Sequence, residues 1–192
     1  MLTLADIAQL FARHGGAQYS GEPVTQLAHA LQTAQLAEQN GASDELVTAC
    51  LLHDLGHLLN EQGRGLHDTP SLRGIDDTHQ YFAMPFLRGL MPAAVLDAIR
   101  LHVDAKRYLC FADRDYHAKL SDDSRRSLVL QGGVFDAGAA AAFLAQPGAR
   151  DAVRLRQWDD LAKLADWPTP SLAHYLGRAG RCALPVASAA PA

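Results

Sequence analysis

The chain has 192 residues, of which 48% are apolar and 20% charged, so its length and composition fit one folded domain and exclude an intrinsically disordered chain. Its formal net charge of −4 is spread without a basic block, which argues against nucleic acid as a partner. No apolar run approaches the ~20 residues of a membrane helix, and the first residues do not resemble a signal peptide, so we expect a cytoplasmic protein.

Ala and Leu recur at three- and four-residue spacing, and alternating β-branched runs are missing, which predicts an all-α fold. In chain order, we expect helices over residues 3–14, 24–40, 44–60, 77–89, 92–109, 113–119, 121–130, 136–145, 150–164 and 168–177. A Gly-rich polar loop is expected over 62–73. The prediction is therefore a single helical bundle of about eight to ten helices over residues 1–180, followed by a disordered tail over 181–192.

A histidine and an aspartate interrupt the most apolar of these helices. His53 and Asp54 are adjacent, and His57 follows His53 by four residues. A buried carboxylate is costly unless it is paired or binds a metal ion. His53 and His57 share a helix face, whereas His53 and Asp54 diverge by about 100° on a helix. An isolated pair of this kind is more often a structural hydrogen bond than a metal site.

Other expected helices add ligands of the same chemical type. His29, His79 and His102 each fall in a different helix, and Asp159 lies in a fifth helix near the end of the chain. Imidazole and carboxylate groups together suit a transition metal that prefers nitrogen and oxygen ligands. The set therefore favours a metal site over a structural hydrogen bond.

The order of these ligands resembles that of the HD-domain superfamily, whose five-helix core fits the expected helices. Four segments are similar more specifically to the phosphonate-cleaving HD-domain oxygenases: 18–29, with a Tyr-x-x-Glu pattern, 102–109, with His-x3-Lys, 121–133 and 154–160. The similarity extends from about residue 11 to about residue 178. His-Asp alone is a weak signal, whereas Tyr-x-x-Glu together with His-x3-Lys is a specific one.

The resemblance implies a mixed-valent Fe(II)/Fe(III) site with two iron ions and with O2 as co-substrate. The implied ligands of the first iron are His29, His53, Asp54 and Asp159. Asp54 would bridge to a second iron, completed by His79 and His102, and Tyr19 would bind that iron at rest and move away when substrate arrives.

Spacing alone does not choose between Asp159 and its neighbour Asp160 as the metal ligand. The family match favours Asp159, because it keeps Arg156 three residues before that position and Lys163 four after it. His57 is expected beside the ligands and in contact with substrate, and Gly56 is expected to allow a close approach by a neighbouring segment.

The same resemblance implies an anion site next to the metals. Lys106 lies four residues after His102, on the same helix face. A phosphonate dianion there would be bound by Lys106, Arg156 and the hydroxyl of Ser124, with Ser121 and Ser127 as alternatives. Glu22 would face the far end of the substrate and pair with a cationic amine, unless it only favours the start of the helix that follows.

The sequence therefore predicts O2-dependent cleavage of the C–P bond of a small-molecule organophosphonate. The expected substrate is a 1-hydroxyphosphonate with an amino or trimethylammonio group on carbon 2, and the products are phosphate and glycine or glycine betaine. One alternative is an HD phosphohydrolase, which would need His29, His53, Asp54 and Asp159 but neither Tyr19 nor Glu22. The other is a non-enzymatic, metal-containing regulatory domain. The degree of methylation of the amine and the oligomeric state are left open.

Overall fold

The computed structural model describes residues 2–19, 21–60, 69–76 and 78–185, and within them it contains helices and no strand. The all-α prediction is therefore confirmed. The helices are α1 (Leu4–His14), α2 (Gln26–Gln39), α3 (Asp44–Leu52), α4 (Leu55–Leu59), α5 (His79–Phe82), α6 (Met84–Leu87), α7 (Ala93–Ala112), α8 (Tyr116–Lys119), α9 (Asp122–Leu130), α10 (Ala137–Leu144), α11 (Ala149–Leu161) and α12 (Leu172–Cys182), with a short 3-10 turn, η1 (Ser71–Arg73).

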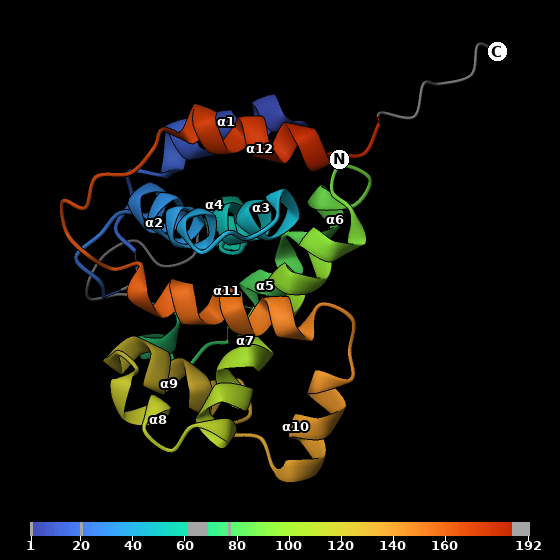
Figure 1. The fold of residues 1–192 in the computed structure, drawn as a ribbon. Helices are drawn as coiled ribbons and strands as arrows, with labels where there is room; N and C mark the ends of the chain where they lie inside the picture. The colour runs from blue at the N-terminus through green and yellow to red at the C-terminus, as the bar shows by residue number, and fades with distance from the viewer. Residues whose placement is uncertain (1, 20, 61–68, 77, 186–192) are drawn as a thin grey trace.

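The helices are arranged in layers around one main core (Figure 1). Helices α1 and α12 cover one side of α2 and α3, while α7 and α11 pack against each other on the opposite side. Helices α8, α9 and α10 lie beyond α7 and α11. The main core is built from buried apolar side chains of both ends of the chain, among them Ile7, Leu51, Ile99, Leu155 and Tyr175. The inner helices α2, α3, α7 and α11 are therefore held from both sides.

Short polar side chains fix where several of these helices begin. Thr25 accepts a hydrogen bond from the backbone N–H of Ala28 at 3.1 Å and so caps α2. Ser43 caps α3 in the same way. Each cap satisfies a backbone donor that has no partner within its own helix. The starts of α2 and α3 are thus fixed independently of the site that these helices later form.

Two predicted helices are each divided in the structure. The helix expected over 44–60 breaks between α3 and α4, because Asp54 leaves helical geometry with φ −100° and ψ 12°. The helix expected over 77–89 divides into α5 and α6 at Ala83, next to Pro85, which has no backbone N–H to continue the helix. The prediction of two continuous helices here is wrong. In a continuous helix the side chains of His53 and Asp54 would point about 100° apart, and the break at Asp54 removes this constraint.

The last helix also differs from its prediction. It begins after Ser171, which caps it, and continues to Cys182 instead of ending near Gly177. Its final turn is held to α3 because Arg181 pairs with Asp44 at 2.6 Å. The tail expected over 181–192 lies outside the described residues from 186 onward. The same holds for the expected loop over 62–73 up to residue 68, and within the described remainder η1 occupies Ser71–Arg73.

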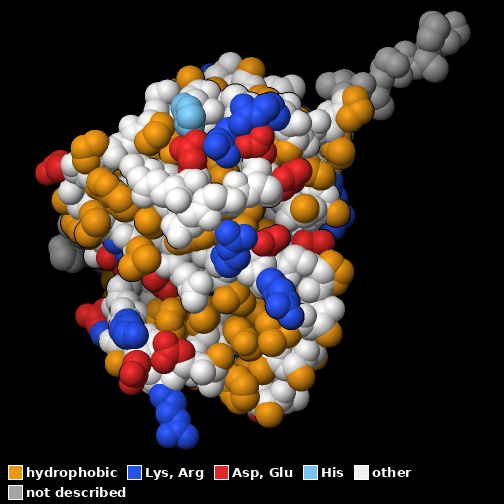
Figure 2. All heavy atoms as spheres, viewed as in Figure 1, with side chains coloured by type: hydrophobic (Ala, Val, Ile, Leu, Met, Phe, Trp, Pro, Cys, Tyr) orange, Lys and Arg blue, Asp and Glu red, His pale blue; other side chains and the backbone are white. Residues whose placement is uncertain are grey.

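Charged side chains of both signs lie interspersed on the face shown in Figure 2. No helix among the described residues is long and apolar enough to cross a membrane. The cytoplasmic location and the absence of a nucleic acid partner stay predictions.

Gly56 lets the backbone of α5 approach the start of α4. A Cβ atom at this position would lie 2.1 Å from the carbonyl oxygen of His79. We expect Gly56→Ala to lower the free energy of unfolding of the metal-free protein by about 1–3 kcal/mol, the usual cost of overpacking. Thermal and denaturant unfolding would measure it.

Gly177→Ala provides the matched control. Gly177 lies within α12, and a Cβ there would meet no atom within 4 Å, so the variant should be as stable as the natural chain or more so. Equal stability of the two variants would show that the close approach of the His79 backbone does not require glycine at position 56.

Candidate metal centre and anion pocket

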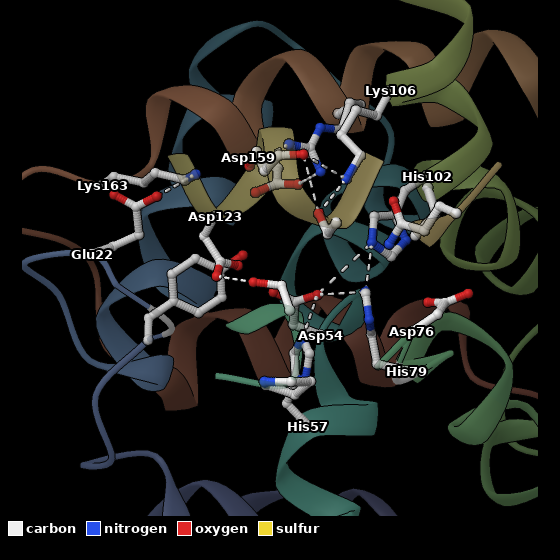
Figure 3. Close-up of a pocket in the computed structure, with 18 of the residues that line it drawn as sticks. Glu22, Asp54, His57, Asp76, His79, His102, Lys106, Asp123, Asp159 and Lys163 are labelled. Carbon is white, nitrogen blue, oxygen red and sulfur yellow. Dashed lines mark hydrogen bonds and ion pairs between the residues drawn. The ribbon is translucent and has the colours of Figure 1, made fainter. Parts of the chain in front are cut away.

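Five separate parts of the fold direct polar side chains into one buried region. His29 comes from α2, His53 and Asp54 from the junction of α3 and α4, and His79 from the first turn of α5. His102 lies in the middle of α7 and Asp159 near the end of α11. Figure 3 shows Asp54, His79 and His102 converging. All six side chains are buried, and His29 and His53 have no exposed surface.

His29 and His53 form the first half of this cluster. The Nδ1 atom of His29 lies 2.8 Å from the carbonyl oxygen of Ala162, and that of His53 lies 2.8 Å from the carbonyl oxygen of Cys50. Each Nδ1 therefore carries the proton, and each Nε2 is left with a lone pair. The two Nε2 atoms face each other at 3.2 Å. Two lone pairs form no hydrogen bond, whereas a shared cation would stabilise both.

Two carboxylate oxygens face the same point. Asp54 Oδ2 lies 3.5 Å from His29 Nε2 and 3.3 Å from His53 Nε2. Asp159 Oδ1 lies 3.3 Å from His29 Nε2. Both oxygens are buried and have no hydrogen-bond donor among the described residues. Buried oxygens without donors are costly, so this set of two nitrogens and two oxygens fits a metal ion.

A second group of the same kind lies on the other side of Asp54. His79 Nε2 and His102 Nε2 are 3.0 Å apart, and His102 Nδ1 donates to the carbonyl oxygen of Ile99 at 2.7 Å. Asp54 Oδ1 lies 3.3 Å from His79 Nε2 and 3.8 Å from His102 Nε2. Asp54 therefore directs one oxygen to each pair of histidines, as a bridging ligand would.

His57 lies next to this second group. Its Nε2 atom is 3.8 Å from Asp54 Oδ1, and its ring stacks on the ring of His79 with centroids 4.2 Å apart. Asp54, His57 and His79 have donor atoms close enough together to hold an ion. The sequence placed His57 beside the ligands, and the structure brings it to the edge of the second group.

The electrostatics of the cluster favour a bound cation. Burial raises the pKa of Asp54, but the surrounding imidazoles, His53 first, outweigh burial and hold that pKa well below its usual range. Burial likewise raises the pKa of Asp159, but the guanidinium of Arg156 together with His29 and His53 outweighs burial and holds that pKa well below its usual range. Both carboxylates are therefore ionised, and their oxygens are directed at the Nε2 atoms of the neighbouring imidazoles.

The structure separates the roles of Asp159 and Asp160, between which spacing could not choose. Asp160 accepts hydrogen bonds from the guanidinium of Arg156 and from the hydroxyl of Tyr116. Asp159 uses Oδ2 to pair with Arg156 Nη1 at 2.9 Å, which leaves Oδ1 directed at His29. Only Asp159 of the two faces the histidines.

Tyr19 lies over the first group of ligands. Its ring stacks on the ring of His29 with centroids 3.9 Å apart. Burial, followed by the charges of Asp54 and Asp159, raises its pKa well above the usual value. Its predicted binding to the second metal ion stays a prediction.

A cavity that is partly open to solvent adjoins the cluster. Lys106 lines it from α7, one turn beyond His102, and only 2% of its surface is exposed. Its Nζ atom donates to Ser127 Oγ at 2.7 Å and to the carbonyl oxygen of Ser124 at 3.4 Å. No carboxylate of the described chain pairs with this ammonium. Burial, and then Arg156, lowers the pKa of Lys106 to about 7.

The serines of α9 divide between capping and the cavity. Ser121 caps α9 by accepting from the backbone N–H of Ser124, whereas Ser124 and Ser127 line the cavity. Arg156 reaches Ser124 Oγ at 3.5 Å. The sequence preferred Ser124 as the hydroxyl next to Lys106, and the structure places Ser127 closer. The sequence signal that Ser127 could also reach Lys106 was its spacing of three residues from Ser124, which puts both serines on one helix face.

Glu22 also lines the cavity, but it already has a partner. Lys163 Nζ lies 2.9 Å from Glu22 Oε1, and Lys163 itself lines the cavity. The sequence expected Glu22 to pair with a substrate amine and gave Lys163 no role in binding. In Figure 3 the two side chains lie on the side of the cavity away from His102.

Comparison with known proteins relates this geometry to two enzymes. The HD-domain family profile matches residues 27–131, a segment that includes all four histidines of the cluster and His57 beside it. The 1-hydroxy-2-(trimethylamino)ethylphosphonate dioxygenase (glycine-betaine-forming) of Leisingera caerulea is 39% identical over 170 residues, which cover 88% of this chain and 84% of that protein. Hydroxymethylphosphonate dioxygenase of Gimesia maris is 40% identical over 173 residues, or 90% and 84% of the two chains.

Proposed function

Because the chain belongs to the HD-domain family, we propose that it is an oxygenase that uses O2 to cleave the C–P bond of a 1-hydroxyphosphonate. The observation that carries the proposal is the buried Lys106 ammonium, which lacks a carboxylate partner in the described chain and lines the same cavity as the metal-fitting cluster. Such a site suits a small molecule that is dianionic at one end and bears a metal-binding hydroxyl next to it.

The proposed ligands of two iron ions follow from the cluster. They are His29, His53, Asp54 and Asp159 for one ion, and Asp54, His79 and His102 for the other. Iron bound there, in the Fe(II)/Fe(III) state that the family resemblance implies, would supply the oxidation of carbon 1 by O2.

The chain's own residues would bind and orient the substrate. Lys106 and the hydroxyls of Ser124 and Ser127 would hold the phosphonate oxygens. Arg156 is fixed by Asp159 and Asp160 and adds positive charge next to them. This anchoring would place carbon 1 beside the cluster, which is the positioning that a reaction at that carbon requires.

Tyr19, Glu22 and His57 would complete the site. The ring of Tyr19 covers His29 and would keep water from the resting cluster. His57 lines the cavity beside His79 and would contact the substrate. Glu22 would receive a cationic group on carbon 2, where the substrate has one.

The proposed reaction balances with one molecule of O2. One C–H bond and the C–P bond of carbon 1 break, and O2 is reduced by four electrons as its atoms enter the products. One oxygen atom joins carbon 1 to form the carboxylate, and the other joins phosphorus to form phosphate. With 2-amino-1-hydroxyethylphosphonate the products are glycine and phosphate, with the trimethylammonio analogue they are glycine betaine and phosphate, and no further reductant is needed.

Phosphate release by the iron-loaded protein, measured in air and under strict anaerobiosis, tests the proposal. The substrates are (R)-2-amino-1-hydroxyethylphosphonate, its trimethylammonio analogue and hydroxymethylphosphonate. We expect release from at least one of them in air, with the carboxylate formed in equal amount, and at least about a hundredfold less without O2. Release from a phosphate ester that does not depend on O2, with every phosphonate left intact, would overturn the proposal in favour of a phosphohydrolase.

A further inference from the structure

The two ends of the cavity differ in how their charges are balanced. At one end the ammonium of Lys106 has serine oxygens as partners and no carboxylate in the described chain. At the other end the carboxylate of Glu22 is paired with Lys163 at 2.9 Å. Lys106 therefore offers a positive charge without a carboxylate partner in the described chain, whereas the carboxylate of Glu22 is already paired with a cation.

Local structure holds Lys163 in this place. Its two backbone neighbours are fixed, because the carbonyl oxygen of Ala162 accepts from His29, and Leu164 exchanges two hydrogen bonds with the side chain of Gln32. The Lys163 and Glu22 side chains are each only 13% exposed. The ammonium also lies 5.9 Å from the ring centroid of Tyr19, within the range of a cation–π interaction.

Glu22 is held by the turn that also carries Tyr19. Gln18 and Thr25 pair across this turn, and the backbone N–H of Glu22 donates to the carbonyl oxygen of Tyr19 at 3.0 Å. The Glu22 carboxylate therefore stays at the cavity wall, and a ligand cation that approaches it has to share it with Lys163, which already pairs with Oε1. Asp123, another carboxylate of the wall, is occupied by Thr69, Ser71 and Arg126.

We propose that Lys163 is a specificity-determining residue whose ammonium occupies Glu22 in place of a substrate cation, so that it disfavours hydroxyphosphonates with a cationic group relative to those without one. This inference rests on the proposed function, because it concerns which hydroxyphosphonates the same cavity prefers. A cationic substrate must either displace Lys163 from Glu22 or share the carboxylate beside its positive charge, and both weaken binding, whereas hydroxymethylphosphonate leaves the pair in place.

Binding without turnover tests this directly. Calorimetry on the anaerobic, iron-loaded protein would measure the Kd of (R)-2-amino-1-hydroxyethylphosphonate and of hydroxymethylphosphonate. We expect Lys163→Met to change the ratio of the two Kd values about tenfold in favour of the cationic ligand, the factor that corresponds to one charge-assisted hydrogen bond. Lys163→Arg, which keeps the charge, should restore the natural ratio, and Lys163→Gln provides a second neutral variant if Lys163→Met does not fold.

Two further variants separate this effect from a general one. Lys119→Met removes an exposed positive charge on α8 that does not line the cavity, and it should leave the ratio unchanged. In a Glu22→Gln background, Lys163→Met should no longer change the ratio of the two Kd values, because Lys163 acts through its ion pair with Glu22. A lysine that only tethers the turn would change stability and both Kd values together, and it would leave their ratio unaltered.

The outcomes distinguish the inference from the proposed function. If the protein cleaves a hydroxyphosphonate in air but Lys163→Met and Lys163→Gln leave the ratio of Kd values unaltered, the role of Lys163 is overturned and the proposed function stands. A protein that binds none of these phosphonates and releases no phosphate from them overturns the proposed function, and this inference with it.

Discussion

Asp54→Asn is expected to lower phosphate release by about a thousandfold or more. It is also expected to lower the metal content from the proposed two ions per chain to less than one. The reason is that Asp54 directs one oxygen to His29 and His53 and the other to His79 and His102. An amide keeps the shape of the side chain but removes its charge and one acceptor oxygen. Elemental analysis of metal content and phosphate release from hydroxyphosphonates would measure the change.

Asp151→Asn is the matched control, because Asp151 pairs with Arg154 on the exposed side of α11 and contacts none of the clustered histidines. It should retain metal content and phosphate release. Circular dichroism would verify that Asp54→Asn folds. Full metal content in folded Asp54→Asn would contradict the bridging role proposed for Asp54.

Lys106→Met is expected to raise the Kd for hydroxymethylphosphonate about a hundredfold, because the phosphonate loses a buried charged donor. The effect depends on pH. The pKa of Lys106 is about 7 in the free protein, and a bound dianion favours the charged form of the amine. Affinity should therefore weaken as pH rises above 7, by up to about tenfold per pH unit, while Lys106→Met shows no such weakening. Calorimetry between pH 6 and 9 would measure both.

Although Lys106→Met should weaken phosphonate binding, it should stabilise the folded protein. Burial lowers the pKa of Lys106 below its unfolded value of 10.5, so the charged form destabilises the folded protein fully below pH 7, and this destabilisation diminishes as pH rises toward 10.5. Lys106→Met should therefore raise the Tm more at pH 6 than at pH 9. Lys119→Met, on the surface, should change neither Kd nor Tm. An unchanged Kd in Lys106→Met would exclude Lys106 from the anion site.

The sequence predicted the fold class and the chemical type of the site well, because both depend on local patterns. Apolar spacing identified the helices, and histidines within apolar helices identified the cluster. The break at Asp54 could not be predicted in this way, because it depends on where the rest of the chain places the other ligands. A continuous helix over 44–60 satisfies every local preference of that segment.

Pairing between distant residues accounts for the remaining differences. From the sequence alone, Glu22 was predicted to have a free carboxylate, since nothing local indicates that Lys163, just after the end of α11, pairs with it. Sequence reasoning likewise preferred Ser124 but left Ser121 and Ser127 as alternatives, because the reach of Lys106 depends on how α7 is placed relative to α9. Asp159 and Asp160 were separated only by the orientation of α11, which turns one toward His29 and the other toward Tyr116.

The ligands of the cluster are far apart along the chain, and this has a consequence for assembly. The contact between His29 and Ala162, next to the cluster, alone joins residues 133 positions apart. An ion bound by residues from both ends of the chain would close long loops. Such closure is possible only after the helices have come together. We therefore expect binding of a metal ion to follow assembly of the helices that carry its ligands.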